Sequence, residues 1–226
     1  MEIIYQDENS VVIHGDCRKV LPIIKPSDFW QDLGDKFDFC LTDPPYGADL
    51  KGGTWGKIMD ETYSAWDKQP FAETDLLIAS ARHCCIWGGN YFMLPPSRGW
   101  LVWHKSYLPT MADVELAWTS LNMNARLFRQ ARAIGKDRHH PTQKPMDLIQ
   151  WCIVQVEKEI QAPIQVIIDP CAGAGTTAVA AKNLEKRCVT IDLERSYCDA
   201  TVRRLQQNCF KFTPTIKPQK ETELNL

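Results

Sequence analysis

One segment constrains the fold more than any other: VIIDPCAGAGTT, from Val166 to Thr177. Its apolar start is typical of a strand that is buried on both faces. Gly173 and Gly175 then allow a tight turn in which the backbone can approach a ligand, and an alanine-rich stretch follows. A strand, a glycine turn and a helix in this order are typical of doubly wound α/β sheets, where ligands bind beyond the carboxyl ends of the strands. The segment therefore predicts such a sheet and a ligand site at that edge.

Short apolar runs and amphipathic stretches alternate along the rest of the chain. Such alternation indicates an α/β fold, and the 44% apolar and 24% charged content excludes a disordered chain. Strands are predicted at residues 11–14, 37–42, 84–87, 100–104, 114–119, 165–168 and 188–191. Helices are predicted at residues 73–82, 145–160, 176–184 and 196–209.

The length of 226 residues fits one domain, which we expect over residues 1–212 with a short basic insertion near 120–140 and a tail at 213–226. The net charge of -2 excludes a basic coat, so nucleic acid would have to bind a local patch. No apolar run reaches the roughly 18 residues of a membrane helix, and the acidic start does not resemble a signal peptide. Nine cysteines without a C-x-x-C pair do not indicate zinc or a disulfide framework. We therefore expect a cytoplasmic protein that binds neither membrane nor metal.

Two aspartates predict the kind of ligand. Asp169 stands directly before the glycine turn, where its carboxylate would repel phosphate and attract an ammonium group. The dinucleotide fingerprint also lacks its third glycine, because Ala178 stands there. Asp192 ends the next predicted strand, where a carboxylate can accept hydrogen bonds from ribose hydroxyls. An amino-acid end and a nucleoside end describe S-adenosylmethionine and disfavour a nicotinamide dehydrogenase. The alternative is a structural turn beside an exposed aspartate.

A second constellation follows the strand at 37–42. In Asp43-Pro44-Pro45-Tyr46 the two prolines stiffen the backbone and remove two N–H donors, so their carbonyls are free. Such a corner can hold an exocyclic amine between a carboxylate and a main-chain carbonyl, with the tyrosine ring stacked on the base. The alternative is a proline turn without function.

These motifs together resemble the amino-methylating DNA methyltransferases, which act on N6 of adenine or N4 of cytosine. The resemblance rests on residues 43–46, 140–145 (HPTQKP), 169–176 and 191–192, and also on 14–17 and 87–91. The order, with the catalytic motif first and the cofactor motif last, is similar to the circularly permuted β-group of the family. It implies a Rossmann-like sheet of about seven mostly parallel strands, with an antiparallel hairpin edge for which 100–104 and 114–119 are candidates.

The resemblance also implies a reaction and its residues. A methyl group would pass from S-adenosylmethionine to the N6 amine of an adenine flipped out of DNA, at a specific site. The implied catalytic residues are Asp43, Pro44, Pro45 and Tyr46. The implied cofactor-binding residues are Asp16, Thr142, Lys144, Asp169, Pro170, Gly173, Gly175, Thr176 and Asp192. Among these, Lys144 and Thr142 are expected at the cofactor carboxylate and Asp16 at the adenine amine.

The chain departs from the family pattern in two respects. Cys171 and Ala174 stand where the family often has Phe and Ser, and the large target-recognition region is missing between Thr119 and His140. Readout of a site would then depend on short loops, a homodimer or a separate recognition partner. Basic residues in this stretch are the expected phosphate contacts, namely Arg126, Arg129, Arg132, Lys136 and Arg138.

Three alternatives for the substrate and the activity remain open at this point. The acceptor could be N4 of cytosine, or an adenine in RNA. The chain could also be a non-catalytic nucleic-acid-binding subunit with the same fold. Whether a restriction nuclease accompanies a modification enzyme of this kind is not determined by the sequence.

Overall fold

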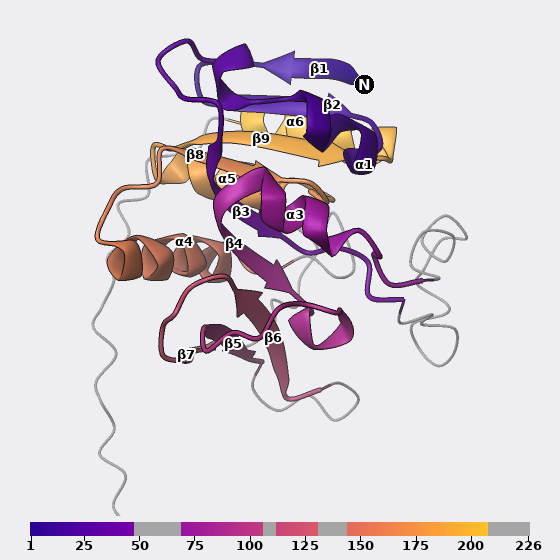
Figure 1. Ribbon diagram of the computed structural model, residues 1–226. Helices are drawn as coiled ribbons and strands as arrows, with labels where there is room; N and C mark the ends of the chain where they lie inside the picture. Colours follow the sequence, from indigo (N-terminus) through magenta and orange to yellow (C-terminus); the bar gives the residue numbers. More distant parts are fainter. Residues whose placement is uncertain (48–68, 106–111, 131–143, 208–226) are drawn as a thin grey trace, which may run out of the picture.

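The computed structural model describes residues 1–47, 69–105, 112–130 and 144–207 (Figure 1). Within them nine strands form one sheet in the order β1-β2-β9-β8-β3-β4-β6-β5-β7. The strands are β1 (Glu2–Gln6), β2 (Ser10–His14), β3 (Phe37–Thr42), β4 (Ala81–Trp87), β5 (Trp100–His104), β6 (Val114–Thr119), β7 (Arg126–Arg129), β8 (Val166–Asp169) and β9 (Arg187–Asp192). The longer helices are α3 (Thr74–Ser80), α4 (Met146–Ile160), α5 (Thr176–Asn183) and α6 (Arg195–Gln206), and α1 (Cys17–Val20) is a single turn.

The centre of the sheet is parallel. Strands β2, β9, β8, β3 and β4 all run the same way, so their carboxyl ends meet at one edge. Strand β1 is antiparallel to β2, and β6 is antiparallel to both β4 and β5. The predicted α/β fold class is confirmed, and the sheet places the Asp43 corner beside the Asp169 turn because β3 and β8 are direct neighbours.

Two sequence predictions about the sheet need correction. The sheet has nine strands in the described residues and not about seven, because β1 and β7 were not predicted. Strand β7 (RLFR) has four residues, three of them exposed, so it lacks the apolar run that marks a buried strand. The hairpin of β5 and β6 forms as expected, but it is not the edge, since β7 pairs in parallel with β5 and covers it.

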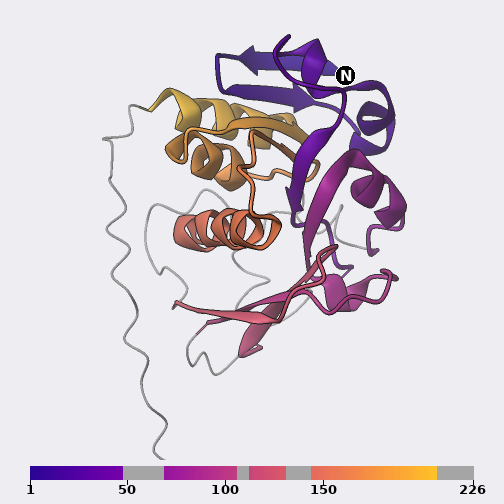
Figure 2. The ribbon, with the colours of Figure 1, turned by 60° about the vertical axis from the view of Figure 1, so that its left-hand side comes forward.

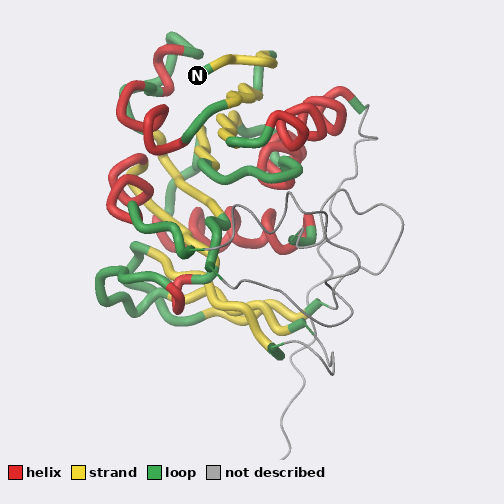
Figure 3. The backbone as a smooth tube through the Cα atoms, turned by 90° about the vertical axis from the view of Figure 1, so that its right-hand side faces the viewer, coloured by secondary structure: helices red, strands yellow, loops and turns green. Residues whose placement is uncertain are grey.

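Helices cover both faces of the sheet, and Figures 2 and 3 show the layers from two directions. Side chains alternate between the faces along each central strand, as the pleat requires. In β3, Phe39 and Leu41 join the cluster formed with α4, α5 and α6, while Cys40 joins the cluster that holds α1 and α3. Both faces of β3 are therefore buried, which explains its almost continuous apolar sequence.

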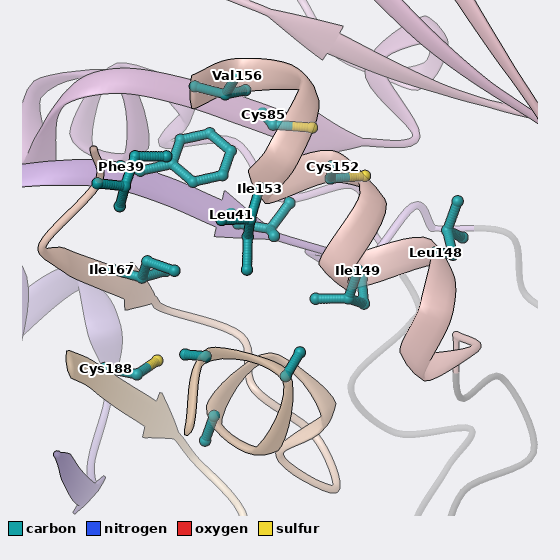
Figure 4. Close-up of a cluster of buried hydrophobic side chains, with 14 of the residues drawn as sticks. Phe39, Leu41, Cys85, Leu148, Ile149, Cys152, Ile153, Val156, Ile167 and Cys188 are labelled. Carbon is teal, nitrogen blue, oxygen red and sulfur yellow. The ribbon is translucent and has the colours of Figure 1, made fainter. Parts of the chain in front are cut away.

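Helix α4 forms the centre of one apolar layer. Its buried residues recur every three or four positions and make one apolar stripe: Leu148, Ile149, Cys152, Ile153 and Val156. Figure 4 shows this stripe together with Phe39 and Leu41 of β3. Gln161 ends the helix in the left-handed region with a φ of 54°. The start of α4 lies directly after Lys144, so packing of the stripe also positions that lysine. None of the described helices is both long and apolar enough to cross a bilayer.

Shortening Ile153 tests this packing. Its side chain is 0% exposed, so Ile153→Ala should lower the free energy of unfolding by about 2–5 kcal/mol, because the buried atoms are removed and a cavity remains. Urea unfolding followed by far-UV circular dichroism measures the change. The control Ile23→Ala, at a residue that is 66% exposed, should stay within about 0.5 kcal/mol of the unchanged protein. Equal losses of stability in both variants would contradict the packing described for α4.

Candidate active site

A cavity of about 620 Å³ opens where β3, β4, β8 and β9 end. Its lining joins residues that are far apart in the chain, including Asp43, Trp87, Asp169 and Asp192. Such an edge is where open parallel sheets bind ligands. The sequence-predicted residues that line it are Asp16, Asp43, Pro45, Lys144, Asp169, Pro170, Gly173, Thr176 and Asp192.

The first part of the site is a pair of carboxylates at neighbouring strand ends. Asp169 is 3% exposed and accepts a hydrogen bond from the Cys171 amide at 3.2 Å. Asp192 accepts from the Gly173 amide and from the Glu194 amide, both at 2.8 Å. Burial raises the pKa of Asp169 to about 6 and that of Asp192 to about 7. Each carboxylate is thus short of stabilising partners, and a ligand that brings a cation or hydroxyl donors would supply them.

The glycine turn between these carboxylates is formed as predicted. Gly173 and Gly175 both adopt positive φ, at 52° and 72°. A Cβ on Gly175 would lie 2.4 Å from the Thr201 side chain, whereas one on Gly173 would meet nothing within 4 Å. Gly175 is therefore required for packing against α6, while Gly173 leaves space at the cavity wall. Thr176 begins α5 directly after the turn.

The second part of the site is the corner after β3. The Tyr46 hydroxyl donates to one Asp43 carboxylate oxygen, and the Lys144 ammonium donates to the other. The Tyr46 ring stacks on Tyr91, with centroids 5.1 Å apart and planes 14° from parallel. The Pro45 carbonyl accepts from the Phe71 amide at 3.0 Å, and no backbone donor from the described residues reaches the Pro44 carbonyl. Asp43 and the Pro44 carbonyl therefore stay the predicted acceptor pair for an amine.

Gly88 keeps that ring in place. It adopts a positive φ of 69°, and a Cβ there would lie 2.1 Å from the Tyr46 ring. The close approach explains why glycine follows β4 at this point.

Two charged residues of the site were not predicted from the sequence, Glu115 and Lys105. Glu115 of β6 contacts Lys144 at 3.3 Å and Lys105 at 2.5 Å. The sequence contained a pattern that could have indicated both residues, because each is a charged residue in or directly after an otherwise apolar strand. The predicted hairpin would have placed them near each other, since Glu115 lies opposite Trp103.

Lys144 itself lies in a different environment from the one expected. It is 7% exposed, and its ammonium contacts Asp43, Glu115 and the Tyr46 hydroxyl. Burial alone would lower its pKa, but the two carboxylates outweigh burial and raise the pKa above the usual value. Lys144 is therefore a charged ammonium, and its expected pairing with a cofactor carboxylate stays a prediction that competes with these three contacts.

Asp16 also lines the cavity. It caps α1 by accepting from the Arg18 amide at 3.1 Å and forms an ion pair with the Arg18 guanidinium at 2.8 Å. Its predicted contact with an adenine amine stays a prediction. Thr142 lies outside the described residues.

The predicted nucleic-acid patch is described only in part. Arg126 and Arg129 lie exposed on β7, the outermost strand. Arg132, Lys136 and Arg138 lie outside the described residues, as does the tail at 213–226. In the described part of the chain no group of three side chains could hold a metal ion, and the eight cysteines there are free thiols.

Comparison with known proteins is consistent with this geometry. A family model described as DNA methylase, for N6 and N4 methyltransferases, matches residues 95–203, which include the Asp169 turn and Asp192. Over this stretch the chain is similar to the N6/N4 amino-methyltransferase family. It is 27% identical over 216 residues to a putative methylase, YubD, of Escherichia coli K12, with 85% of this chain and 88% of the relative covered.

Solved structures share the fold of this chain. The PvuII DNA methyltransferase, named as cytosine-N4-specific, superposes with a TM-score of 0.59 at 13% identity, covering 92% of this chain and 90% of that one. The M1.HpyAVI–SAM complex superposes with a TM-score of 0.52 at 18% identity, covering 86% and 99%. The Rossmann-like methyltransferase fold is thereby confirmed.

The raised pKa of Asp192 predicts a dependence of stability on pH. Folding raises this pKa from 3.8 to about 7, so the folded protein holds a proton that the unfolded chain releases. The contribution of Asp192 to the free energy of unfolding is fully present below about pH 4 and is lost as the pH rises through about 7. Asp192→Asn removes this loss and should be more stable than the unchanged protein at pH 8, by at most about 4 kcal/mol.

Urea unfolding between pH 4 and pH 8 measures this difference. Asp199→Asn is the control, because Asp199 is an exposed carboxylate on α6. Parallel pH profiles for Asp192→Asn and the unchanged protein would contradict the assignment.

Proposed function

We propose that this protein is an S-adenosylmethionine-dependent DNA methyltransferase that methylates the exocyclic N6 amine of a flipped adenine at a specific site. The observation that carries the proposal is the cavity in which the Asp43 corner faces two under-compensated carboxylates, Asp169 and Asp192. Similarity to the amino-methyltransferase family supports the reaction class. The domain extent of 1–212 and a cytoplasmic location belong to the same proposal.

The cavity fits the cofactor by the chemistry of its donors and acceptors. The buried Asp169 carboxylate, whose pKa is raised, suits the ammonium of the methionine end. Asp192 beside the glycine turn suits the two ribose hydroxyls, and Asp16 suits the adenine amine. Gly173 leaves the cavity wall open beside Asp192. A complex of the related fold with SAM supports this placement.

The Asp43 corner would bind and orient the acceptor amine. The cofactor supplies a methyl group on a positively charged sulfonium. Asp43 and the Pro44 carbonyl accept the two N–H bonds of the amine, which turns its lone pair from the ring toward the methyl carbon. As the nitrogen–methyl bond forms, the methyl–sulfur bond would break and a neutral thioether would leave, while Asp43 would stabilise the positive charge on nitrogen until the amine releases one proton to solvent. No nucleophilic cysteine is required, which agrees with the buried positions of Cys40, Cys84 and Cys85.

The aromatic ring at the corner receives the base. Flipping a base out of duplex DNA costs a few kcal/mol, and stacking on Tyr46 offsets about 1–3 kcal/mol of that cost. One face of Tyr46 is covered by Tyr91. The base therefore either takes the other face or displaces Tyr91, which is exposed and able to move.

Adenine is preferred over cytosine because the corner carries aspartate in the D-P-P-Y pattern. A cytosine-N4 enzyme remains the second candidate, since the PvuII enzyme has the same fold. RNA adenine is a third. A non-catalytic subunit is disfavoured, because such a protein has no need to keep Asp43 hydrogen-bonded to both Tyr46 and Lys144.

Labelled cofactor and nucleoside analysis test the substrate. The purified protein is incubated with tritiated S-adenosylmethionine and mixed duplex DNA, which is then digested to nucleosides. Label in the N6-methyladenine nucleoside is the expected result, whereas label in N4-methylcytosine would replace the base and keep the mechanism. No transfer to DNA despite cofactor binding would contradict the proposal.

The role of Asp43 is tested in the same assay. Asp43→Ala should reduce transfer by at least about 100-fold, because it removes the acceptor of the amine proton and the charge that stabilises the transition state. Cofactor affinity, measured by calorimetry, should change little, since Asp169 and Asp192 are intact. A variant with nearly normal turnover would show that Asp43 is not catalytic.

The basic patch predicts a change in the salt dependence of DNA binding. Arg126→Gln with Arg129→Gln should lower the slope of log affinity against log salt by about 0.9 for each phosphate that is no longer neutralised. Fluorescence anisotropy with a labelled duplex measures the slope. Lys158→Gln, an exposed lysine on α4, is the control. An unchanged slope in the double variant would place the DNA elsewhere. The described loops are short for reading a DNA sequence. A homodimer or a separate partner would therefore supply the rest of the sequence recognition.

A further inference from the structure

Four charged side chains alternate in sign through the protein interior beside the cavity. Lys105 contacts one oxygen of Glu115 at 2.5 Å, and Lys144 contacts the other oxygen at 3.3 Å. Lys144 then pairs with Asp43. The two lysines are 3% and 7% exposed. Similarity to the family and the proposed reaction explain Asp43, but they assign nothing to Glu115 or Lys105.

The four residues come from four separate segments of the fold. Lys105 follows β5 and Glu115 lies in β6, while Asp43 follows β3 and Lys144 precedes α4. The Lys105 amide donates to the Asp113 carbonyl at 3.0 Å, which extends the β5–β6 pairing to this point. The hairpin therefore delivers a carboxylate to Lys144, which itself lines the cavity. Without Glu115, the Lys105 ammonium would lose this ion pair, and Lys144 would keep one of its two carboxylate partners, Asp43.

All three N–H bonds of the Lys144 ammonium have partners here. They are directed to Asp43, to Glu115 and to the Tyr46 hydroxyl at 3.3 Å. An ammonium has three donors and no acceptor, so this set uses all of them and leaves its position little freedom. On Asp43, Lys144 occupies one oxygen and Tyr46 the other. Each carboxylate oxygen has a second lone pair, so Asp43 is held in one orientation and can still accept a bond from an amine.

We propose that Glu115 is a positioning residue that, with Lys105 behind it, holds the Lys144 ammonium against Asp43 and thereby fixes the carboxylate that receives the target amine. The inference rests on the proposed methyl transfer for its kinetic consequence. Glu115 touches neither the amine nor the cofactor in this role and acts through Lys144.

The charge state of Lys144 gives the inference a second readout. The charged groups that face its ammonium are Asp43 and Glu115, with Lys105 beyond Glu115, and its uncharged neighbours are the Tyr46 hydroxyl and the Trp87 ring, whose centroid lies 5.1 Å away. Burial lowers the pKa of Lys144 and the two carboxylates raise it above 10.5. Removing the charge of Glu115 leaves the burial unchanged and takes away one of the two carboxylates, so this pKa must fall.

The test is Glu115→Gln, which keeps the shape and removes the charge. We expect kcat to fall by about 10-fold or more, because the acceptor loses its fixed orientation. KM for DNA and the cofactor affinity should stay within about 3-fold, since this is an effect on the transition state. NMR of the side-chain nitrogens, with Lys144→Met for assignment, should show the pKa of Lys144 lowered by about one unit or more.

Two variants serve as controls for that result. Glu157→Gln breaks a similarly half-buried Glu–Lys pair, with Lys186 at 2.6 Å, away from the cavity, and should leave kcat and the Lys144 pKa unchanged. Adding Lys105→Met to Glu115→Gln removes the cation that has lost its partner, so the Lys144 pKa should move back toward the original value. A double variant with the same pKa as Glu115→Gln would contradict the part assigned to Lys105.

Glu115→Asp covers the case in which glutamine prevents folding. It keeps the charge and shortens the side chain, so kcat should fall while the Lys144 pKa stays close to that of the unchanged protein. Normal kcat in a folded Glu115→Gln or Glu115→Asp variant would overturn the inference. The NMR measurement needs neither DNA nor methyl transfer. A lowered Lys144 pKa in a protein that methylates nothing would contradict the proposed function alone, whereas an unchanged pKa in an active enzyme would contradict this inference alone.

Discussion

The parallel pairing of β3 with β8 is the contact on which the rest of the site depends. Phe39 lies opposite Ile167 and Cys40 opposite Ile168, so both strands end at the same edge. Asp43 follows one strand and Asp169 ends the other, although more than half of the chain separates them. Because the pairing is parallel and buried on both faces, it cannot slip by one residue without turning the apolar side chains of β3 away from their layer. The separation between Asp43 and Asp169 is thus set by the register of a buried sheet.

The buried charges of the site fall into two groups, which differ in whether the protein itself supplies their counter-charge. At the proposed cofactor site, burial of Asp169 and Asp192 outweighs their hydrogen bonds and raises their pKa values, so a bound cation or hydroxyl would lower the cost of their charge. On the amine side Asp43 is already compensated by Lys144, and Lys144 is compensated by Glu115. One group is organised for a ligand that brings positive charge. The other group is organised before any ligand arrives, as expected for a carboxylate that must be oriented in the transition state.

The antiparallel part of the sheet has a role in this arrangement. Strand β6 runs against β4 and β5, and it contributes Glu115 to the cavity side of the molecule. The same strand ends in buried packing, where the Trp118 indole donates to the Pro95 carbonyl at 2.8 Å. Strand β7 closes the sheet beyond β5 and exposes Arg126 and Arg129. Strands β5, β6 and β7, which extend the parallel sheet, thus carry both half-buried Glu115 and the exposed Arg126 and Arg129.

The sequence by itself determined the parallel core and the acidic and glycine residues at its strand ends. These signals are local: β3, β5 and β6 have the predicted bounds because a run of apolar residues between turns is typical of a buried strand wherever it lies. Only the tertiary structure decided which charges meet. Strand β7 was missed because its stability comes from pairing with β5 and not from its own composition. The contacts of Lys144 with Asp43 and Glu115 were not predicted, since a buried ammonium is held by whichever carboxylates the packing of β3, β6 and α4 brings within hydrogen-bond distance.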